Sequence, residues 1–305
     1  MKTKIAIVGT GGVGGFLGGL LARHYEGSSE VEIHFISRGE ALANIRRDGL
    51  RVDAQQGAFT ARPTTATDSA AEIGTMDYVL YCTKAYDVEG GIAGIRPCIG
   101  PRTVILPFLN GVDSAEKIKR MLPDNEVWDG CVYVVAYIVE PGHIVERTNG
   151  YRYLFGSPPF ARPAEELHAS SPKPTSAPGS KRSSCGGWDK FAFISTVATP
   201  RPTPTRPRRR IERCTKPTDF MALLDEFQAV AQDAESRLGR HRLARRRTDG
   251  THSRRHDDFH ATGFPGGRST EVESLTGYVV REGRRPGVPT PVYDLMYRGC
   301  SKEGK

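Results

Sequence analysis

The chain has 305 residues, enough for two domains, with 38% hydrophobic residues and a formal net charge of +8. No apolar run approaches the length of a membrane span, and the first residues lack the apolar core of a signal peptide, so we expect a cytoplasmic protein without membrane contact. The six cysteines form no CxxC pair, which is typical of a reducing compartment and predicts neither a metal site nor disulfides.

The first fifteen residues predict a dinucleotide-binding turn. A β-branched run at residues 4–8 leads into a glycine-rich turn, and an apolar helical pattern follows. This order of strand, turn and helix places free N–H groups and the positive end of a helix dipole against a pyrophosphate. We expect the cofactor to contact Gly9, Thr10, Gly11, Gly12, Val13 and Gly14. The alternative is a glycine turn that serves packing alone.

The end of the second predicted strand, residues 31–36, indicates which dinucleotide binds. Enzymes that use NAD place an acidic residue there for the ribose 2′-hydroxyl, whereas this chain has Ser37-Arg38-Gly39. A guanidinium attracts a 2′-phosphate through charge and bidentate hydrogen bonds. Arg38 therefore favours NADP(H) as the cofactor, and the alternative is an ordinary surface arginine.

Two further strands end in polar residues. The strand at residues 76–83 is followed by Lys84, and the strand at 103–109 by Asn110. Ligands of an open parallel sheet lie beyond the carboxyl ends of its strands, so both side chains are candidates for binding cofactor and substrate. The alternatives are a solvated lysine and a turn asparagine.

Antiparallel strands are predicted at the end of this first domain. Residues 131–138 and 142–146 read as strands joined by Pro141-Gly142, and residues 151–156 as another. We expect them to extend the same sheet, which would end near residue 157.

The second half of the chain is unusual in composition. Residues 1–165 hold 17 basic and 19 acidic residues, and residues 166–305 hold 26 and 16. Three stretches lack the helical apolar period and are expected to be irregular: a linker at 168–187, residues 200–217 with five prolines and six arginines, and residues 237–266 with eight arginines. One hypothesis is local reading-frame shifts within an ordinary enzyme sequence. The rival is an arginine-rich nucleic-acid-binding insert, but the stretches have few lysines or aromatic residues, so we expect no nucleic-acid partner.

Three histidines in the last of these stretches have helical spacing. His252, His256 and His260 could bind zinc. Because the stretch lacks core residues, we interpret the spacing as coincidence and expect no metal.

Taken together, the motifs resemble the ketopantoate reductase (2-dehydropantoate 2-reductase) family. The resemblance is carried by the following pieces: Gly9–Gly14, Ser37-Arg38-Gly39, Thr83-Lys84-Ala85, Asn110-Gly111, Pro141-Gly142, Trp188-Asp189-Lys190-Phe191, residues 270–277 and residues 287–292. It runs through most of residues 1–165 and continues in islands.

The resemblance implies an α/β Rossmann-type N-terminal domain, residues 1–167, followed by a mostly α-helical catalytic domain, residues 188–305. It also implies NADPH-dependent reduction of 2-dehydropantoate to pantoate, for pantothenate and coenzyme A biosynthesis. In the second domain we expect helices near 188–199, 218–233 and 270–285.

Residue roles follow from the same resemblance. Lys190 matches the catalytic lysine, Glu271 the substrate-binding glutamate, and Lys84 and Asn110 the other substrate-binding residues. An ammonium can stabilise and protonate the alkoxide that hydride attack on a ketone creates, and a carboxylate can bind a substrate hydroxyl. The alternatives are a helix lysine that reaches solvent and a charge that serves a helix start.

The chain departs from the family pattern at three positions. Ile194 and Ala198 stand where asparagines usually follow the lysine, and Thr276 replaces another asparagine. These changes leave open a reductase of a different 2-keto acid, or an NADPH-binding protein inactive through a damaged second domain. The oligomeric state stays open as well, with a homodimer as one possibility.

Overall fold

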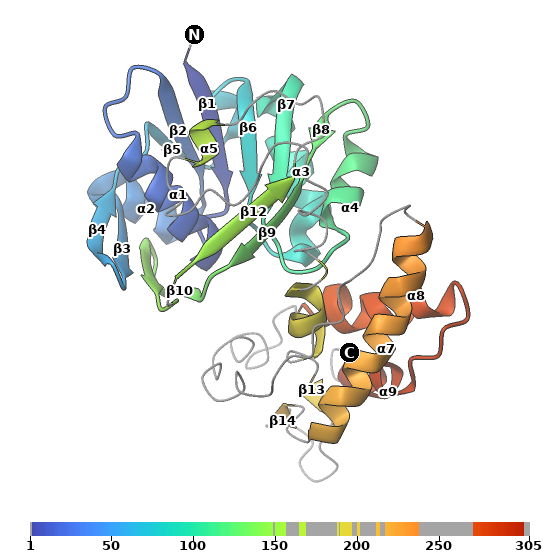
Figure 1. Cartoon of the computed structure of the whole chain (residues 1–305). Helices are drawn as coiled ribbons and strands as arrows, with labels where there is room; N and C mark the ends of the chain where they lie inside the picture. The colour runs from blue at the N-terminus through green and yellow to red at the C-terminus, as the bar shows by residue number, and fades with distance from the viewer. Residues whose placement is uncertain are drawn as a thin grey trace. The chain divides into compact units, whose positions relative to one another are not determined.

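The computed structural model describes residues 2–148, 150–156, 165–168, 188, 190–196, 200–201, 212–213, 217–237 and 271–301. The chain divides into two compact units. Unit 1 contains residues 1–109 and 113–186, and unit 2 contains residues 110–112 and 187–305. Figure 1 shows strands and helices in the first and mainly helices in the second.

Unit 1 is built on a six-stranded parallel sheet in the order β5-β2-β1-β6-β7-β8. Its strands are β1 (Thr3–Val8), β2 (Val31–Ile36), β5 (Thr65–Thr67), β6 (Met76–Tyr81), β7 (Ile99–Pro107) and β8 (Glu126–Val127). The helices between them are α1 (Gly12–His24), α2 (Gly39–Asp48), α3 (Val88–Ile95) and α4 (Ser114–Met121). The prediction of a Rossmann-type first domain is confirmed, and β2 has the predicted bounds.

A second sheet packs against α1. Its order is β10-β11-β3-β4, from β3 (Leu50–Ala54), β4 (Gly57–Ala61), β10 (Ala136–Glu140) and β11 (His143–Glu146). A separate pair joins β9 (Asp129–Tyr133) to β12 (Arg152–Gly156). The predicted single strand at 131–138 is therefore wrong, because the chain leaves one sheet after Tyr133 and enters another at Ala136. The prediction that these strands extend the parallel sheet is also wrong.

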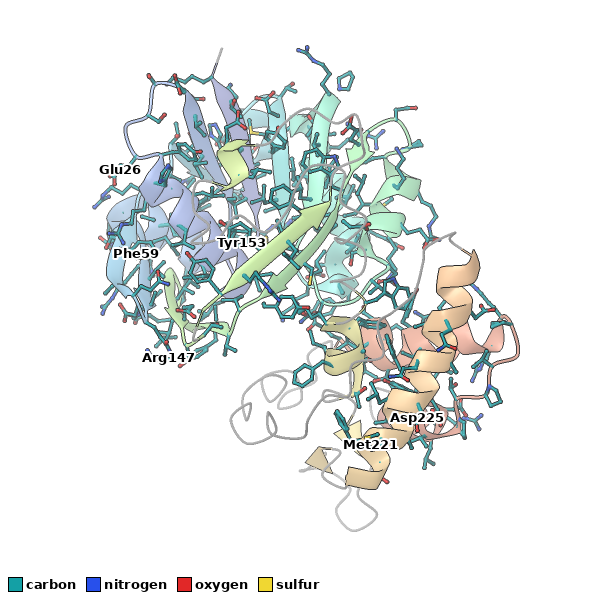
Figure 2. All side chains as sticks on the ribbon, viewed as in Figure 1. Glu26, Phe59, Arg147, Tyr153, Met221 and Asp225 are labelled. Carbon is teal, nitrogen blue, oxygen red and sulfur yellow. The ribbon has the colours of Figure 1, made fainter. Side chains whose placement is uncertain are left out.

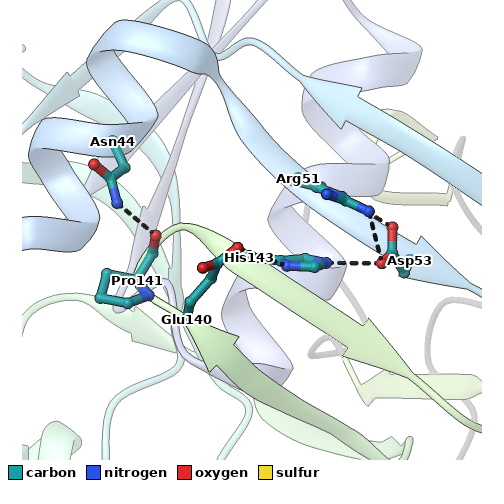
Figure 3. A network of polar contacts seen from close by, with 6 residues as sticks. All are labelled: Asn44, Arg51, Asp53, Glu140, Pro141 and His143. Atoms are coloured by element: carbon teal, nitrogen blue, oxygen red, sulfur yellow. Dashed lines mark hydrogen bonds and ion pairs between the residues drawn. The ribbon is translucent and has the colours of Figure 1, made fainter.

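Polar contacts tie the β10–β11 hairpin to its neighbours (Figure 3). His143 Nε2 lies 2.8 Å from Asp53 Oδ2 on β3, and its Nδ1 lies 3.3 Å from Glu140 Oε1. The hydrogen bond with His143, together with Arg51, holds the pKa of Asp53 below its usual value. Asn44 of α2 donates to the carbonyl of Pro141, 2.8 Å away, at the hairpin turn. The hairpin is thus attached at both its turn and its strands.

Aromatic side chains fill the space between β9–β12 and the parallel sheet. Trp128 is 1% exposed and stacks on Phe155, with ring centroids 6.0 Å apart. Tyr153, labelled in Figure 2, meets Phe108 edge to face at 6.5 Å. Such pairs add a little stability beyond the area they bury, so the β9–β12 pair belongs to the core of unit 1.

Unit 2 is mainly helical among its described residues. Its helical parts are residues 190–196, α7 (Pro217–Arg237), the π-helical segment η5 (Glu273–Gly277), α8 (Tyr278–Arg284) and α9 (Pro291–Ser301). They share an apolar core in which Phe191 contacts Phe227 and Tyr278, with centroids 5.4 and 5.5 Å apart. The prediction of a mostly helical second domain is confirmed, and α9 is an addition to the predicted helices.

The start of α9 is capped by a side chain from another helix. Glu226 of α7 accepts hydrogen bonds from the backbone N–H groups of Val292 and Tyr293, at 2.8 and 3.0 Å. These are N–H groups that lack partners within their own helix. Glu226 therefore connects α7 to α9.

Much of the arginine-rich sequence lies outside the described residues. Within residues 200–217, β13 (Pro200–Arg201) pairs with β14 (Glu212–Arg213) in an antiparallel arrangement. Of the predicted linker, His168 ends the short helix α5 (Glu165–His168), and residues 169–187 and 238–266 are outside the described part. Across the helices that the structure describes, none is long and apolar enough to span a membrane.

A buried histidine in the parallel sheet generates a prediction about acid stability. His34 on β2 is 4% exposed, and its ring nitrogens have no hydrogen-bond partner among the described residues. Burial lowers the pKa of His34 below the unfolded value of 6.5, although Glu32, 3.6 Å away, opposes this. The unfolded chain therefore takes up a proton first as the pH falls, and stability present above pH 6.5 is lost on acidification.

As the pH falls below 6.5, we expect the urea midpoint of unfolding to decrease less steeply in His34→Leu than in wild type. The matched control is His24→Gln, at an exposed histidine near the end of α1, which should leave the slope unchanged. An identical slope in wild type and His34→Leu would show that another group causes the acid sensitivity.

Candidate functional site

The glycine-rich turn joins β1 to α1 at the carboxyl end of the parallel sheet. Gly9 has a φ of +88°, a conformation that side chains rarely allow. Gly11 precedes the first turn of α1 in an extended conformation, and no side chain caps the helix start. The first N–H groups of α1 are thus available as hydrogen-bond donors, and together with the positive end of the helix dipole they suit a phosphate group.

The free space around Gly11 and Gly14 differs, and this indicates that the two glycines have different roles. A Cβ on Gly14 would lie 2.0 Å from the carbonyl oxygen of Gly9 and 2.6 Å from Cβ of Cys82, so Gly14 is required for packing. A Cβ on Gly11 would meet nothing within 4 Å, and the φ of −72° at this position suits any residue. The fold itself does not require glycine at position 11, which fits a ligand that approaches the backbone there.

The glycine spacing of the motif does not predict the close packing around Gly12 and Cys82. A Cβ on Gly12 would lie 2.1 Å from the carbonyl oxygen of Ala136 on β10, so the second sheet presses directly against the turn. Cys82 lies behind the turn, and burial raises the pKa of its thiol to about 12. Cys82 therefore stays protonated and acts as an apolar wall.

The end of β2 lies beside the turn. Thr10 Oγ1 is 2.6 Å from Ser37 Oγ, and both residues are buried. Arg38 follows directly, is exposed, and extends its guanidinium toward α3, where Nη2 lies 3.8 Å from the Cβ position of Gly94. Arg38 thus supplies an accessible positive charge next to the glycine-rich turn.

Lys84 is exposed at the carboxyl end of β6, the strand beside β1, and precedes the short segment η2 (Ala85–Asp87).

Three of the predicted site residues meet in unit 2. Lys190 Nζ donates to Asn110 Oδ1, 3.1 Å away, and Asn110 Nδ2 donates to Glu271 Oε2, 3.4 Å away. All three side chains are partly buried. The amide oxygen faces the ammonium and the amide nitrogen faces the carboxylate, so the network assigns the orientation of Asn110.

Local structure explains how these residues are held. Lys190 lies at the start of the described helical stretch 190–196. Its neighbours Trp188 and Phe191 are 4% and 1% exposed and belong to the apolar core of unit 2. Glu271 lies two residues before η5, and its carbonyl accepts the N–H of Leu275 at 3.0 Å. Asn110 follows β7 and groups with unit 2 through residues 110–112. Lys84 belongs to unit 1.

His252, His256, His260 and Ala198 lie outside the described residues. In the part of the chain that the structure covers, no group of three or more histidine, cysteine or acidic side chains could hold a metal ion.

Comparison with known proteins identifies relatives of this chain. The family model "Ketopantoate reductase PanE/ApbA" matches residues 5–158, and its C-terminal counterpart matches residues 216–301. The crystal structure of 2-dehydropantoate 2-reductase from Porphyromonas gingivalis W83 is 34% identical, with a TM-score of 0.74 over 99% of this chain and 100% of that one.

Curated relatives differ in the length that they share with this chain. A 2-dehydropantoate 2-reductase from Caulobacter vibrioides is 25% identical over 96% of this chain and 97% of its own length. An uncharacterized oxidoreductase from Bacillus subtilis, YkpB, is 29% identical over 50% of this chain. The chain spans only about half of that relative, 48% of its length.

The contrast between Gly11 and Gly14 can be tested by substitution. We expect Gly11→Ala to leave the free energy of unfolding within about 0.5 kcal/mol of wild type but to weaken dinucleotide binding roughly tenfold, because a methyl group would occupy the ligand's space. The matched variant Gly14→Ala should destabilise unit 1 by about 1–3 kcal/mol. Denaturant unfolding and titration with NADPH measure both effects. Unchanged binding in Gly11→Ala would exclude close approach of the ligand at that position.

Proposed function

The chain belongs to the ketopantoate reductase PanE/ApbA family, and from this we propose that it reduces 2-dehydropantoate to pantoate with NADPH, for pantothenate and coenzyme A biosynthesis. The observation that carries the proposal is the hydrogen-bonded series Lys190–Asn110–Glu271. It places a proton donor, an amide and a carboxylate in contact, which are the groups that ketone reduction and hydroxyl recognition require.

The glycine-rich turn would hold the cofactor. The uncapped start of α1 and the open space at Gly11 fit a pyrophosphate, and Arg38 fits a ribose 2′-phosphate. A bound nicotinamide supplies the hydride. Lys84, at the carboxyl end of β6, would orient the ligands through its positive charge.

Lys190 is the proposed general acid. When hydride adds to the C2 carbonyl carbon, the carbon–oxygen π bond breaks and its electron pair passes to the oxygen. The ammonium of Lys190 stabilises this negative charge and donates a proton to complete the hydroxyl group. The neutral amine then regains its proton from solvent.

Asn110 and Glu271 would bind and orient the substrate. The hydrogen bond to Asn110 Oδ1 holds the Lys190 side chain in one orientation, which reduces the entropy lost at the transition state. The carboxylate of Glu271 can accept a hydrogen bond from the substrate's hydroxyl group. A 2-keto acid without that hydroxyl should therefore bind more weakly.

A reductase of another 2-keto acid is the second candidate. Ile194 lies one turn after Lys190 and is 6% exposed in the apolar core, so it offers no polar group where the family pattern has asparagine. A chain that binds NADPH without turnover is the third. Measuring NADPH oxidation with 2-dehydropantoate and with its analogue lacking the hydroxyl, and NADPH binding on the same sample, separates these candidates.

Removal of the proposed acid should affect turnover far more than binding. We expect Lys190→Ala to lower kcat by roughly 10²–10⁴-fold, the usual contribution of a general acid, with the Kd for NADPH within about twofold of wild type. Lys2→Ala is the control, since Lys2 forms a surface ion pair with Glu32, a type of contact that contributes little. Near-normal turnover of Lys190→Ala would remove Lys190 from the mechanism.

Cofactor preference tests the role of Arg38. We expect Arg38→Ala to weaken NADPH binding by about 10- to 100-fold, the effect of losing a hydrogen-bonded charge pair, and to change NADH binding little. Fluorescence titration with both cofactors measures this. An equal loss for NADPH and NADH would contradict contact with the 2′-phosphate.

A further inference from the structure

Two buried hydroxyl groups meet between the glycine-rich turn and the end of β2. Thr10 Oγ1 and Ser37 Oγ lie 2.6 Å apart, the distance of a good O–H···O hydrogen bond. Thr10 is 8% exposed and Ser37 is 7% exposed. Bulk water therefore has little access to either group, and their hydrogen bonds must come from protein, a ligand or an ordered water.

The hydrogen bond between the two hydroxyl groups uses only one of their two protons. Each hydroxyl carries one proton, and the bond between the two oxygens uses one of the two. Among the residues that the structure describes, no acceptor is found for the second proton. A buried O–H without an acceptor is costly, so the pair is suited to donate to a group that arrives with a ligand.

The surroundings favour an anionic acceptor. Arg38 follows Ser37 and supplies a permanent positive charge. Helix α2 starts at Gly39, and no side chain caps it, so its first N–H groups also face the end of β2. The nearby acidic residues include Glu40 in the first turn of α2, whose side chain is exposed, and Glu72, which accepts a hydrogen bond from Thr67, the partner of the Ser37 N–H. A guanidinium, a helix start and a spare hydroxyl proton together suit a phosphate group.

We infer that the hydroxyl of Ser37 donates a hydrogen bond to the 2′-phosphate of NADP(H), and that Thr10 holds it in place by donating to Ser37 Oγ. Ser37 is then a specificity-determining residue beside Arg38, and Thr10 is a positioning residue. This inference rests on the proposed NADPH-dependent function. It adds a neutral hydrogen-bond donor, the Ser37 hydroxyl, to the charged Arg38 at the end of β2.

Binding by the full chain tests the inference without turnover. Dissociation constants are measured for NADPH and NADH, and for the fragments 2′-phospho-ADP-ribose and ADP-ribose. We expect Ser37→Ala to weaken the two 2′-phosphorylated ligands roughly tenfold or more and the other two by less than about twofold. Ser37→Thr retains the hydroxyl and should restore most of the lost affinity.

A double-mutant cycle tests the positioning role of Thr10. Thr10→Val keeps the shape of the side chain and removes its hydroxyl, so it should weaken NADPH by less than Ser37→Ala does. The double variant should bind NADPH as Ser37→Ala does, since Thr10 acts through Ser37. The control is Thr103→Val, which removes another buried hydroxyl of the same sheet. That hydroxyl donates to the carbonyl of Met76 at 2.6 Å, so its loss should leave the NADPH:NADH affinity ratio unchanged.

The outcomes distinguish this inference from the proposed function. If wild type prefers NADPH but Ser37→Ala loses affinity for NADPH and NADH equally, the hydroxyl binds the pyrophosphate and the inference is overturned. If Ser37→Ala binds all four ligands as wild type does, the inference is overturned while the proposed function stands. If wild type binds neither NADPH nor NADH, the proposed function fails and the inference fails with it.

Discussion

The close packing of α1 between two sheets is the constraint on which the rest of unit 1 depends. On one side, the Cβ position of Gly14 lies 2.0 Å from the carbonyl oxygen of Gly9, and on the other that of Gly12 lies 2.1 Å from the carbonyl of Ala136. Only hydrogen atoms fit in these gaps, so any side chain would move a backbone segment. The glycine-rich turn therefore obtains its shape from backbone contacts on both faces, and no side chain caps the helix start that follows it.

A second organising feature is the pairing of opposite charges through an amide in unit 2. Lys190 and Glu271 do not have to meet directly, because Asn110 accepts from one and donates to the other. Partial burial makes such polar groups more dependent on their partners than they would be in water. The arrangement keeps an ammonium and a carboxylate close together, which is why we propose that the chemistry takes place in this part of the chain.

Parts of the fold could be predicted because their signals are local. The parallel strands, such as β2, are short apolar runs followed directly by turn residues, and the glycine spacing identifies the first turn. The second sheet could not be predicted in the same way. Its strand β11 pairs in parallel with β3, about ninety residues earlier, and β4 is largely exposed, so no local pattern marks these strands as partners. The apolar run at 131–138 was misread for a related reason: a continuous run does not show where the chain passes from one sheet to another.

By itself, the sequence determined the Rossmann-type first domain, the mostly helical second domain and the family, because glycine spacing, strand periodicity and motif order are properties of neighbouring residues. It also supplied the candidates Lys84, Asn110, Lys190 and Glu271, though not their arrangement. Only the tertiary structure brought Lys190 and Glu271 to opposite ends of Asn110, across separations of 80 and 161 residues. Only the tertiary structure placed the hydroxyl of Thr10 against that of Ser37. Contacts of this kind depend on how elements pack in space, and hydrogen-bond partners distant in sequence leave no periodic signal along the chain.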